Sequence, residues 1–147
     1  MEKKVFDKDE VKMMMRKMSN NFKFRRKLDE CDGGLVSIEA GGKVFAEFLE
    51  KKYNLPRTEV FINSYDNEKG ILKNKVSIEI SRELINNRNK RYMFVDDVYE
   101  TGMTWTILKA IFPNSYLVVL VNKNHDNRDD VIKGDFVPQD QWVEFEW

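Results

Sequence analysis

The hydrophobic positions of the chain follow helical spacing in some segments and form short strand-like runs in others. Near the start, four apolar residues fall at i, i+3, i+4 and i+7, which predicts a helix with one face packed against a core. Asp7 stands at the expected N-cap, Glu10 completes a capping box, and Phe6 precedes them as a hydrophobic staple. The residues of the apolar stripe are Val11, Met14, Met15 and Met18.

Short apolar and β-branched runs predict the strands of a central sheet. The first and the third of these runs are followed by a glycine-containing turn and then by apolar residues at helical spacing. The first of the two helices extends to about Tyr53, and Pro113 ends the second. Strands that alternate with helices predict an α/β fold with a mostly parallel sheet flanked by helices. The predicted strands are residues 35–38, 60–63, 92–95 and 116–121.

Other segments carry no clear helical or buried-strand period. Residues 19–33 are polar and basic and are expected to form a solvated connector. Residues 71–80 contain alternating apolar positions typical of an exposed β-ribbon, and residues 82–90 are expected to form a loop. Because the sequence shows no linker, repeat or low-complexity tract, residues 1–147 are predicted to form a single domain.

The composition excludes several classes of function. The 147 residues contain 25 Lys and Arg against 25 Asp and Glu, so no global basic excess favours nucleic-acid binding. No apolar run approaches the roughly 18 residues of a membrane span, and the first residues lack a secretory signal pattern, so we expect a cytoplasmic protein. With one cysteine, Cys31, and one histidine, His125, an internal disulfide is excluded and a zinc site is not expected.

The chemistry is concentrated at the end of the third predicted strand. Two adjacent carboxylates, Asp96 and Asp97, are followed by Glu100 and then by Thr-Gly-Met-Thr at residues 101–104, where a helix begins. A helix N-terminus with a glycine and two hydroxyls offers free backbone N–H groups to a phosphate. Acids beside a phosphate site repel the ligand unless they bind hydroxyl groups or a cation. The segment therefore predicts a ligand with a phosphate, vicinal hydroxyls and Mg²⁺, which are features of a sugar phosphate.

Residues 94–104, Phe-Val-Asp-Asp-Val-Tyr-Glu-Thr-Gly-Met-Thr, resemble the phosphoribosyl-pyrophosphate (PRPP) binding motif of type I phosphoribosyltransferases. A weaker similarity extends over residues 36–147 and is greatest to bacterial xanthine-guanine phosphoribosyltransferases. The resemblance implies the type I phosphoribosyltransferase fold, with a small base-binding hood at about 135–147 and a flexible lid at about 66–90. The further segments that carry the resemblance are residues 63–66, Lys123 and residues 137–143.

The resemblance implies a role for each residue of the PRPP motif. Asp96 and Asp97 would bind the ribose hydroxyls, and Asp97 would also hold Mg²⁺, directly or through water. Glu100 stands in place of the aspartate that handles the proton on purine N7, so Glu100, Asp97 and Asp96 form the implied catalytic set. The turn that would bind the 5′-phosphate consists of Glu100, Thr101, Gly102, Met103 and Thr104.

Two other groups of residues complete the site that the resemblance implies. Lys123 would recognise the exocyclic oxygen of a purine, Trp142 would stack on the base, and the backbone carbonyl of Val143 would read an exocyclic amino group. A non-proline cis peptide bond is expected near the start of the pyrophosphate loop. The residues of that loop would be Glu39, Ala40, Gly41 and Gly42.

The implied reaction transfers the phosphoribosyl group of PRPP to a 6-oxopurine (guanine, xanthine or hypoxanthine) and releases pyrophosphate. Such an enzyme is a pentosyltransferase of purine salvage that requires Mg²⁺, and the family resemblance implies a homo-oligomer, either a dimer or a tetramer. No nucleic-acid or membrane partner is expected. Lys123 favours a 6-oxo group over a 6-amino group, and the preferred base stays open.

Three residues depart from the family pattern. Glu100 is one methylene longer than the usual aspartate, Tyr99 is bulkier than the usual aliphatic residue, and Ala40 stands where the closest relatives carry an arginine. Two alternatives therefore stay open. One is a regulator that binds PRPP or a nucleotide on the same fold without catalysis, and the other is a phosphoribosyltransferase with a different acceptor base.

Several residues near these motifs are expected to play no part in the site. Trp105 is expected to pack in the core, whereas His125, Asp129 and Asp130 are expected to be solvated. Trp147 could either close the pocket or cover an oligomer surface, and the sequence does not decide between the two.

Overall fold

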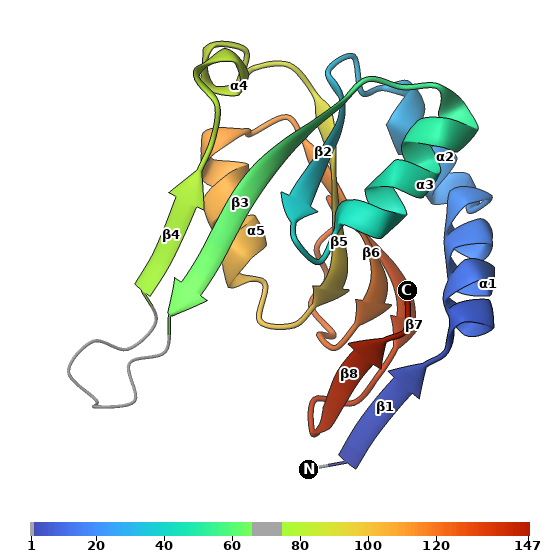
Figure 1. Ribbon diagram of the computed structural model, residues 1–147. Coiled ribbons are helices and arrows are strands. Elements are labelled where there is room, and N and C mark those ends of the chain that lie inside the picture. Colours follow the sequence, from blue (N-terminus) through green and yellow to red (C-terminus); the bar gives the residue numbers. More distant parts are fainter. Residues whose placement is uncertain (1, 66–74) are drawn as a thin grey trace.

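The structure is a computed structural model that describes residues 2–65 and 75–147 of the chain. Its elements form a large sheet with helices on both faces and a small second sheet (Figure 1). None of the helices in this part of the chain has the length and apolar character of a membrane span. The elements in chain order are β1 (Glu2–Phe6), α1 (Lys8–Ser19), α2 (Phe22–Asp29), β2 (Gly34–Glu39), α3 (Lys43–Tyr53), β3 (Arg57–Tyr65), β4 (Lys75–Glu79), α4 (Arg82–Asn86), β5 (Tyr92–Tyr99), α5 (Met103–Ile111), β6 (Tyr116–Asn122), β7 (Val131–Phe136) and β8 (Gln141–Phe145).

The large sheet has the strand order β4-β3-β2-β5-β6-β7. Every neighbouring pair is parallel except β3 and β4, which pair antiparallel. Helices α1 and α3 lie on one face of this sheet, and α5 covers the opposite face (Figure 1). The predicted α/β fold with a mostly parallel sheet is confirmed, and the predicted strands correspond to β2, β3, β5 and β6.

Strand β5 packs side chains into both faces of the sheet. Met93 and Val95 belong to the core on the α1 and α3 side, whereas Phe94 packs against α5. The Phe94 ring lies 5.6 Å from the Trp105 ring and 5.1 Å from the Phe112 ring. Trp105 is 1% exposed, which confirms its predicted place in the core. This packing holds the strand that delivers the acidic residues to the edge of the sheet.

Helix α1 forms as its sequence pattern predicts. The Asp7 carboxylate accepts the N–H of Glu10 at 2.9 Å, and the Glu10 carboxylate accepts the N–H of Asp7 at 3.2 Å. All of the residues in the predicted apolar stripe are buried, and Phe6 joins them in the core. The capping box and the stripe are both confirmed.

The prediction of a solvated connector at residues 19–33 is wrong, because α2 forms there. Asn21 caps the helix by accepting the N–H of Phe24 at 3.0 Å. Phe24 and Leu28, one turn apart, are buried, while the other residues of the helix are mostly basic and more exposed. Two apolar residues are too few to show a helical period in the sequence. The helix is stabilised by packing of this pair against the core.

Residues 66–90, the predicted lid, fall partly outside the described residues. Residues 66–74 are not described, and they include Asp66 of one segment that carries the resemblance. The exposed ribbon is confirmed at β4, which pairs with β3. The loop predicted at residues 82–90 is partly wrong, because α4 begins after Ser81, whose hydroxyl accepts the N–H of Leu84 at 3.2 Å.

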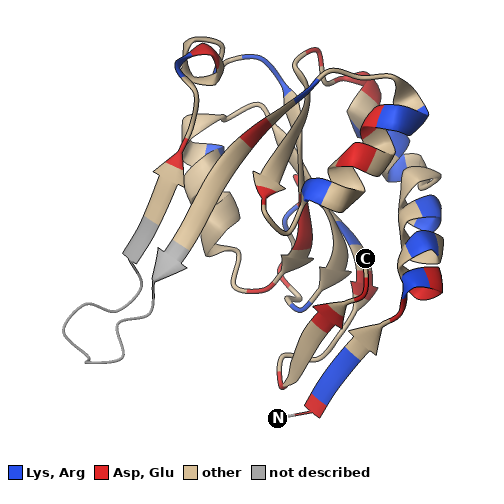
Figure 2. Ribbon diagram, viewed as in Figure 1, with Lys and Arg blue, Asp and Glu red and all other residues tan. Residues whose placement is uncertain are grey.

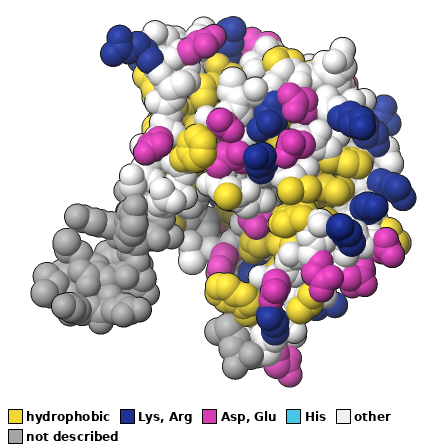
Figure 3. All heavy atoms as spheres, in the orientation of Figure 1, with side chains coloured by type: hydrophobic (Ala, Val, Ile, Leu, Met, Phe, Trp, Pro, Cys, Tyr) yellow, Lys and Arg dark blue, Asp and Glu magenta, His cyan; other side chains and the backbone are white. Residues whose placement is uncertain are grey.

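The second sheet joins the two ends of the chain. Strands β1 and β8 pair in parallel, and the rings of Phe6 and Phe145 stack at a centroid distance of 5.7 Å. Trp147 stacks on Phe145 at 4.9 Å, which gives it a packing partner within the chain. Hydrophobic side chains reach the surface between α3 and the C-terminus of the chain (Figure 3). Strand β1 was not predicted, because only its last residue is buried and it shows no alternation.

The docking of α2 predicts the behaviour of Cys31, just beyond its end. The thiol is buried and donates to the carbonyl of Lys27 at 3.2 Å, and burial raises its pKa to about 12. Because the thiolate is the reactive form, we expect labelling at pH 8 to be at least ~10³-fold slower in the native than in the unfolded protein. The rate is measured with an aromatic disulfide reagent, with and without guanidinium. Rapid labelling of native protein would contradict this packing.

Candidate active site

Segments that follow three neighbouring parallel strands meet at one edge of the sheet. The loop at residues 40–42 follows β2, the turn at residues 100–102 follows β5, and Lys123 follows β6. Because β5 is parallel to both β2 and β6, the carboxyl ends of the three strands lie together. Acidic positions are visible at the ends of β2 and β5 on this edge (Figure 2).

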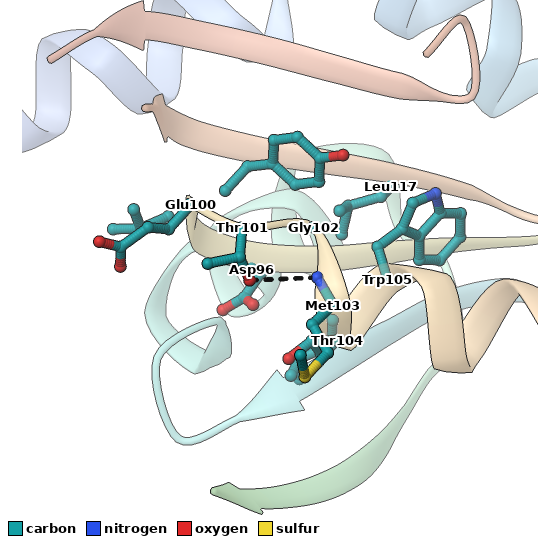
Figure 4. A pocket seen from close by; sticks show the side chains of 11 residues that line it. Asp96, Glu100, Thr101, Gly102, Met103, Thr104, Trp105 and Leu117 are labelled. Carbon is teal, nitrogen blue, oxygen red and sulfur yellow. Dashed lines mark hydrogen bonds between the residues drawn. The ribbon is translucent and has the colours of Figure 1, made fainter. Parts of the chain in front are cut away.

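The turn at residues 101–104 has the geometry of an anion-binding site. Gly102 adopts a φ of 80°, in the left-handed region that favours glycine, and α5 begins at the next residue. The N–H of Met103 donates to the Thr101 hydroxyl at 3.2 Å (Figure 4). The next two N–H groups, of Thr104 and Trp105, have no acceptor within the described chain. They stand at the positive end of the helix dipole, beside a cavity of about 250 Å³.

Asp96 lines this cavity, and its neighbour Asp97 lies at the same strand end. The Asp96 carboxylate accepts the N–H of Asp97 at 2.8 Å, and the Asp97 carboxylate accepts the N–H of Val98 at 2.8 Å. Burial, and then the adjacent Asp97 carboxylate, raise the pKa of Asp96 well above its usual range. A cation or a set of hydroxyl donors at this place would favour the ionised form.

The oxygen-only donors of this strand end suit Mg²⁺. In the described parts of the chain, no group of three or more His, Cys, Asp or Glu side chains is arranged to hold a metal. Mg²⁺ commonly binds through one or two carboxylates together with substrate phosphates and waters. Asp96 and Asp97 therefore fit a Mg²⁺ ion that arrives with a phosphorylated ligand, and they do not form a complete metal cage.

The loop after β2 packs directly on the end of β5. A Cβ atom at Gly41 would lie 2.6 Å from Oδ1 of Asp97, and one at Gly42 would lie 2.1 Å from the carbonyl oxygen of Val95. Only glycine fits at residue 42, where the obstacle is backbone, and a side chain at residue 41 would displace the Asp97 carboxylate. The peptide bond Glu39–Ala40 is cis, as the resemblance implies.

Glu39 is buried and does not line the cavity. Its Oε2 atom has no hydrogen-bond partner within the described residues. Burial, and then the hydrogen bond and charge of Glu59, raise the pKa of the Glu39 carboxyl. Its predicted contact with pyrophosphate stays a prediction, whereas Gly41 of the same loop lies directly against the Asp97 carboxylate.

Lys123 lies on the other side of the turn and pairs with Glu100. Its side chain is only 5% exposed, and Nζ donates to the carbonyl of Gln141 at 2.6 Å and to Oε1 of Glu100 at 3.3 Å. The side-chain amide of Gln139 donates to the Lys123 carbonyl at 2.7 Å. Glu100 points away from the N-terminus of α5 (Figure 4). These bonds join residues 139–141 to the candidate catalytic turn, and Lys123 itself does not line the 250 Å³ cavity.

Trp142 and Val143 follow Gln141 in β8, beside the contact with Lys123. The Trp142 side chain is 62% exposed, and Val143 packs partly against the core. Neither residue lines the 250 Å³ cavity. Their roles as a stacking platform and as a reader of an amino group therefore stay predictions.

Polar residues in the loop between β6 and β7 support the turn, and no sequence pattern predicted this role. Asp130 was expected to be solvated, and this is wrong, because it accepts the indole N–H of Trp105 at 3.0 Å and the guanidinium of Arg128 at 2.9 Å. His125 and Asp129 are exposed, as expected. The partners of Asp130 in α5 are far from it in sequence, so no local pattern reveals them.

No family model matches the sequence, but solved structures resemble it over nearly its full length. A hypothetical protein of Neisseria gonorrhoeae with bound ppGpp has a TM-score of 0.73 at 19% identity, over 99% of this chain and 89% of the other. A purine phosphoribosyltransferase of Pyrococcus horikoshii has a TM-score of 0.71 at 18% identity, over 100% and 95%. A xanthine-guanine-hypoxanthine phosphoribosyltransferase of Helicobacter pylori has a TM-score of 0.64 at 17% identity, over 97% and 92%.

These similarities define the fold of the chain. It is the type I phosphoribosyltransferase fold, with a mostly parallel central sheet between layers of helices. At such low identities, the likeness concerns the arrangement of the backbone. The reaction has to be inferred from the chemistry of the site.

The partial burial of Asp96 and the charge of the adjacent Asp97 predict that neutralising Asp96 stabilises the protein. Because its pKa is raised, the ionised carboxylate opposes folding at neutral pH, and this opposition fades as the pH falls toward the unfolded value of ~3.9. We expect Asp96→Asn to raise the melting temperature at pH 7.5, and we expect the gain to shrink toward pH 4. Thermal unfolding followed by circular dichroism measures both, with the exposed Asp140→Asn as control. An unchanged or lower melting temperature at pH 7.5 would contradict the burial of this charge.

Proposed function

We propose that the protein is a PRPP-dependent phosphoribosyltransferase that converts a 6-oxopurine base to its nucleoside monophosphate and releases pyrophosphate. The observation that carries the proposal is the packing of the glycine loop against Asp97, at the strand end that also leads into the phosphate turn. PRPP matches these three features, with its pyrophosphate at the glycine loop, its ribose hydroxyls at Asp97 and its 5′-phosphate at the turn. The similarity of the fold to purine phosphoribosyltransferases supports the same substrate.

Each part of PRPP has a counterpart in the site. The N–H groups of Thr104 and Trp105 and the helix dipole would bind the 5′-phosphate. Asp96 and Asp97 would accept hydrogen bonds from the ribose hydroxyls, and residues 39–42 would contact the pyrophosphate. As the bond between C1 and pyrophosphate lengthens, positive charge develops on the ribose, and the two carboxylates stabilise it.

Asp96 and Asp97 are the residues that would hold Mg²⁺ together with oxygens of the ligand. When bound, Mg²⁺ neutralises charge on the departing pyrophosphate. The chain itself supplies orientation, because backbone N–H groups of Asp97 and Val98 fix the two carboxylates at 2.8 Å each.

Glu100 and Lys123 suit two adjacent polar atoms of a 6-oxopurine. N7 and O6 lie side by side on such a base, so a carboxylate that handles the N7 proton and an ammonium that donates to O6 would face them together. The pair lies 3.3 Å apart, which sets the two groups at neighbouring positions. A 6-amino group would present a donor to the ammonium and lose this bond. Trp142 and Val143 would complete the base site from the hood.

A second candidate function is a nucleotide-binding regulator without transferase activity. It is favoured by the bound ppGpp in the similar Neisseria gonorrhoeae protein. The phosphate turn would accept a nucleotide phosphate in the same manner as PRPP. Glu100 in place of the usual aspartate and Ala40 in place of an arginine point the same way, since both changes affect groups that the transfer reaction uses.

One incubation separates the two candidates and identifies the base. The protein is mixed with Mg²⁺, PRPP and a pool of guanine, xanthine, hypoxanthine, adenine and pyrimidine bases, and the products are read by mass spectrometry. The proposal expects one or more 6-oxopurine nucleotides and an equal amount of pyrophosphate. Intact PRPP, together with calorimetric binding of PRPP or ppGpp, would support the regulator. A product from a pyrimidine or adenine alone would retain the transfer and overturn the base assignment.

Two substitutions test the assigned roles. We expect Glu100→Gln to lower kcat by ~10²–10⁴-fold, because the amide cannot exchange the N7 proton. We expect Asp97→Asn to lower kcat/KM by ~10²–10³-fold, because it removes charge that stabilises the transition state. Steady-state rates with the identified base check both, and the exposed Asp29→Asn on α2 should retain the full rate. Near-normal rates in both variants, with folding retained, would show that the roles are misassigned.

A further inference from the structure

Tyr99, the last residue of β5, packs against the phosphate turn. Its side chain is 3% exposed and lines the 250 Å³ cavity. A Cβ atom at Gly102 would lie only 2.7 Å from the Tyr99 hydroxyl oxygen and 3.1 Å from Cζ. The backbone of Gly102 therefore rests on the hydroxyl end of this ring, so the position of the ring sets the position of the turn.

The Tyr99 hydroxyl is itself held by Asp126 and Lys133. It donates to Oδ2 of Asp126. Lys133, on β7, donates to Oδ1 and to the carbonyl of Asp126 at 2.7 Å each, and to the carbonyl of Asn124 at 3.2 Å. The same ammonium lies 5.3 Å from the centroid of the Tyr99 ring. All three N–H bonds of Lys133 are thus engaged, and the acceptor of Tyr99 is fixed on both of its oxygens.

The loop that carries Asp126 is ordered by its own side chains. Asn122, Asn124 and Asp126 each accept the N–H two residues further on, at 3.0, 2.9 and 3.4 Å respectively. Three such bonds in sequence form a chain of Asx turns. Asp126 is therefore presented to Tyr99 from a preformed loop.

The same loop also contacts the first turn of α5. Arg128 forms a bidentate pair with Asp130 at 3.0 and 2.9 Å and donates to the Thr106 hydroxyl at 3.3 Å. That hydroxyl donates to the carbonyl of Gly102 at 2.9 Å. Asp130 accepts the indole N–H of Trp105 at 3.0 Å. The loop therefore supports both sides of Gly102, through Tyr99 on one side and through α5 on the other.

We propose that Tyr99, held by Asp126 and Lys133, is a positioning residue that presets the phosphate turn for its ligand. It fixes Gly102 and hence the direction of the N–H groups that follow it. A site whose donors are already in place loses less freedom on binding, so this support raises the affinity for a phosphorylated sugar. The inference deepens the proposed function and rests on it for the identity of PRPP as the natural ligand. The aliphatic residue that is usual at this position in the family has no hydroxyl and could not be held by Asp126.

The test uses ribose 5-phosphate as the probe, because its binding does not require turnover. The variant is Tyr99→Phe, which removes one hydroxyl and keeps the ring. The matched control is Tyr92→Phe at the other end of β5. Tyr92 is 4% exposed, and its hydroxyl donates to the carbonyl of Asn87 at 3.1 Å. Both variants lose one buried hydrogen bond, but only the first lies at the turn.

We expect Tyr99→Phe to weaken ribose 5-phosphate binding by about tenfold in calorimetry, and Tyr92→Phe to leave it unchanged. In turnover assays, the KM for PRPP should rise in Tyr99→Phe while the KM for the base stays constant. Asp126→Ala should weaken binding to a similar degree. The double variant should bind ribose 5-phosphate no more weakly than Asp126→Ala alone, because both substitutions break the same hydrogen bond between Tyr99 and Asp126. Melting curves confirm that each variant is folded.

The outcomes separate this inference from the proposed reaction. Tyr99→Phe that binds ribose 5-phosphate as tightly as the wild type overturns the inference and leaves the transferase proposal intact. An equal loss in Tyr92→Phe also overturns it, because the effect would then be general destabilisation. If Tyr99→Phe alone loses affinity for ribose 5-phosphate but the wild type forms no nucleotide, the inference is upheld and the transferase proposal is overturned.

Discussion

The close approach of two backbones at the carboxyl end of β5 is the constraint on which the site depends. Gly42 meets the carbonyl of Val95, and Gly41 meets the Asp97 carboxylate, at distances that exclude any side chain. The parallel register of β2 and β5, with Ser37 opposite Val95, makes this approach possible. A shift of either strand would separate the loop from the acids and would take apart the site proposed for a phosphate, a ribose and a pyrophosphate.

Negative charge is concentrated at this edge, and the protein compensates it unevenly. Glu100 has Lys123 at 3.3 Å, whereas Asp96 has no ion-pair partner in the described parts of the chain. A partly buried carboxyl without a cation opposes folding, and a ligand that brings a cation or hydroxyl donors relieves this opposition. The unpaired Asp96 carboxyl therefore lowers the stability of the free protein and would favour binding of such a ligand. Functional residues commonly lower stability in this way.

The turn at residues 101–104 is also supported by a loop that lies outside residues 94–104. Tyr99 contacts Gly102 at the turn and donates to Asp126 in the loop between β6 and β7. Arg128 and Asp130 extend this contact to α5. Binding residues are often carried by loops on a rigid scaffold, and here one ordered loop forms part of the scaffold for another.

The sequence by itself determined α1, the central strands and the placement of residues 96–104 between a strand end and a helix start, because each depends on neighbours along the chain that repeat at a helical or strand-like period or form a contiguous motif. The tertiary structure decided α2 and β1, whose short or exposed apolar patterns carry no period. It also decided the pairing of Glu100 with Lys123 and of Tyr99 with Asp126, whose partners stand 23 and 27 residues apart. Only the fold brings such partners together, since burial and hydrogen bonding at a site come from residues that the sequence keeps distant.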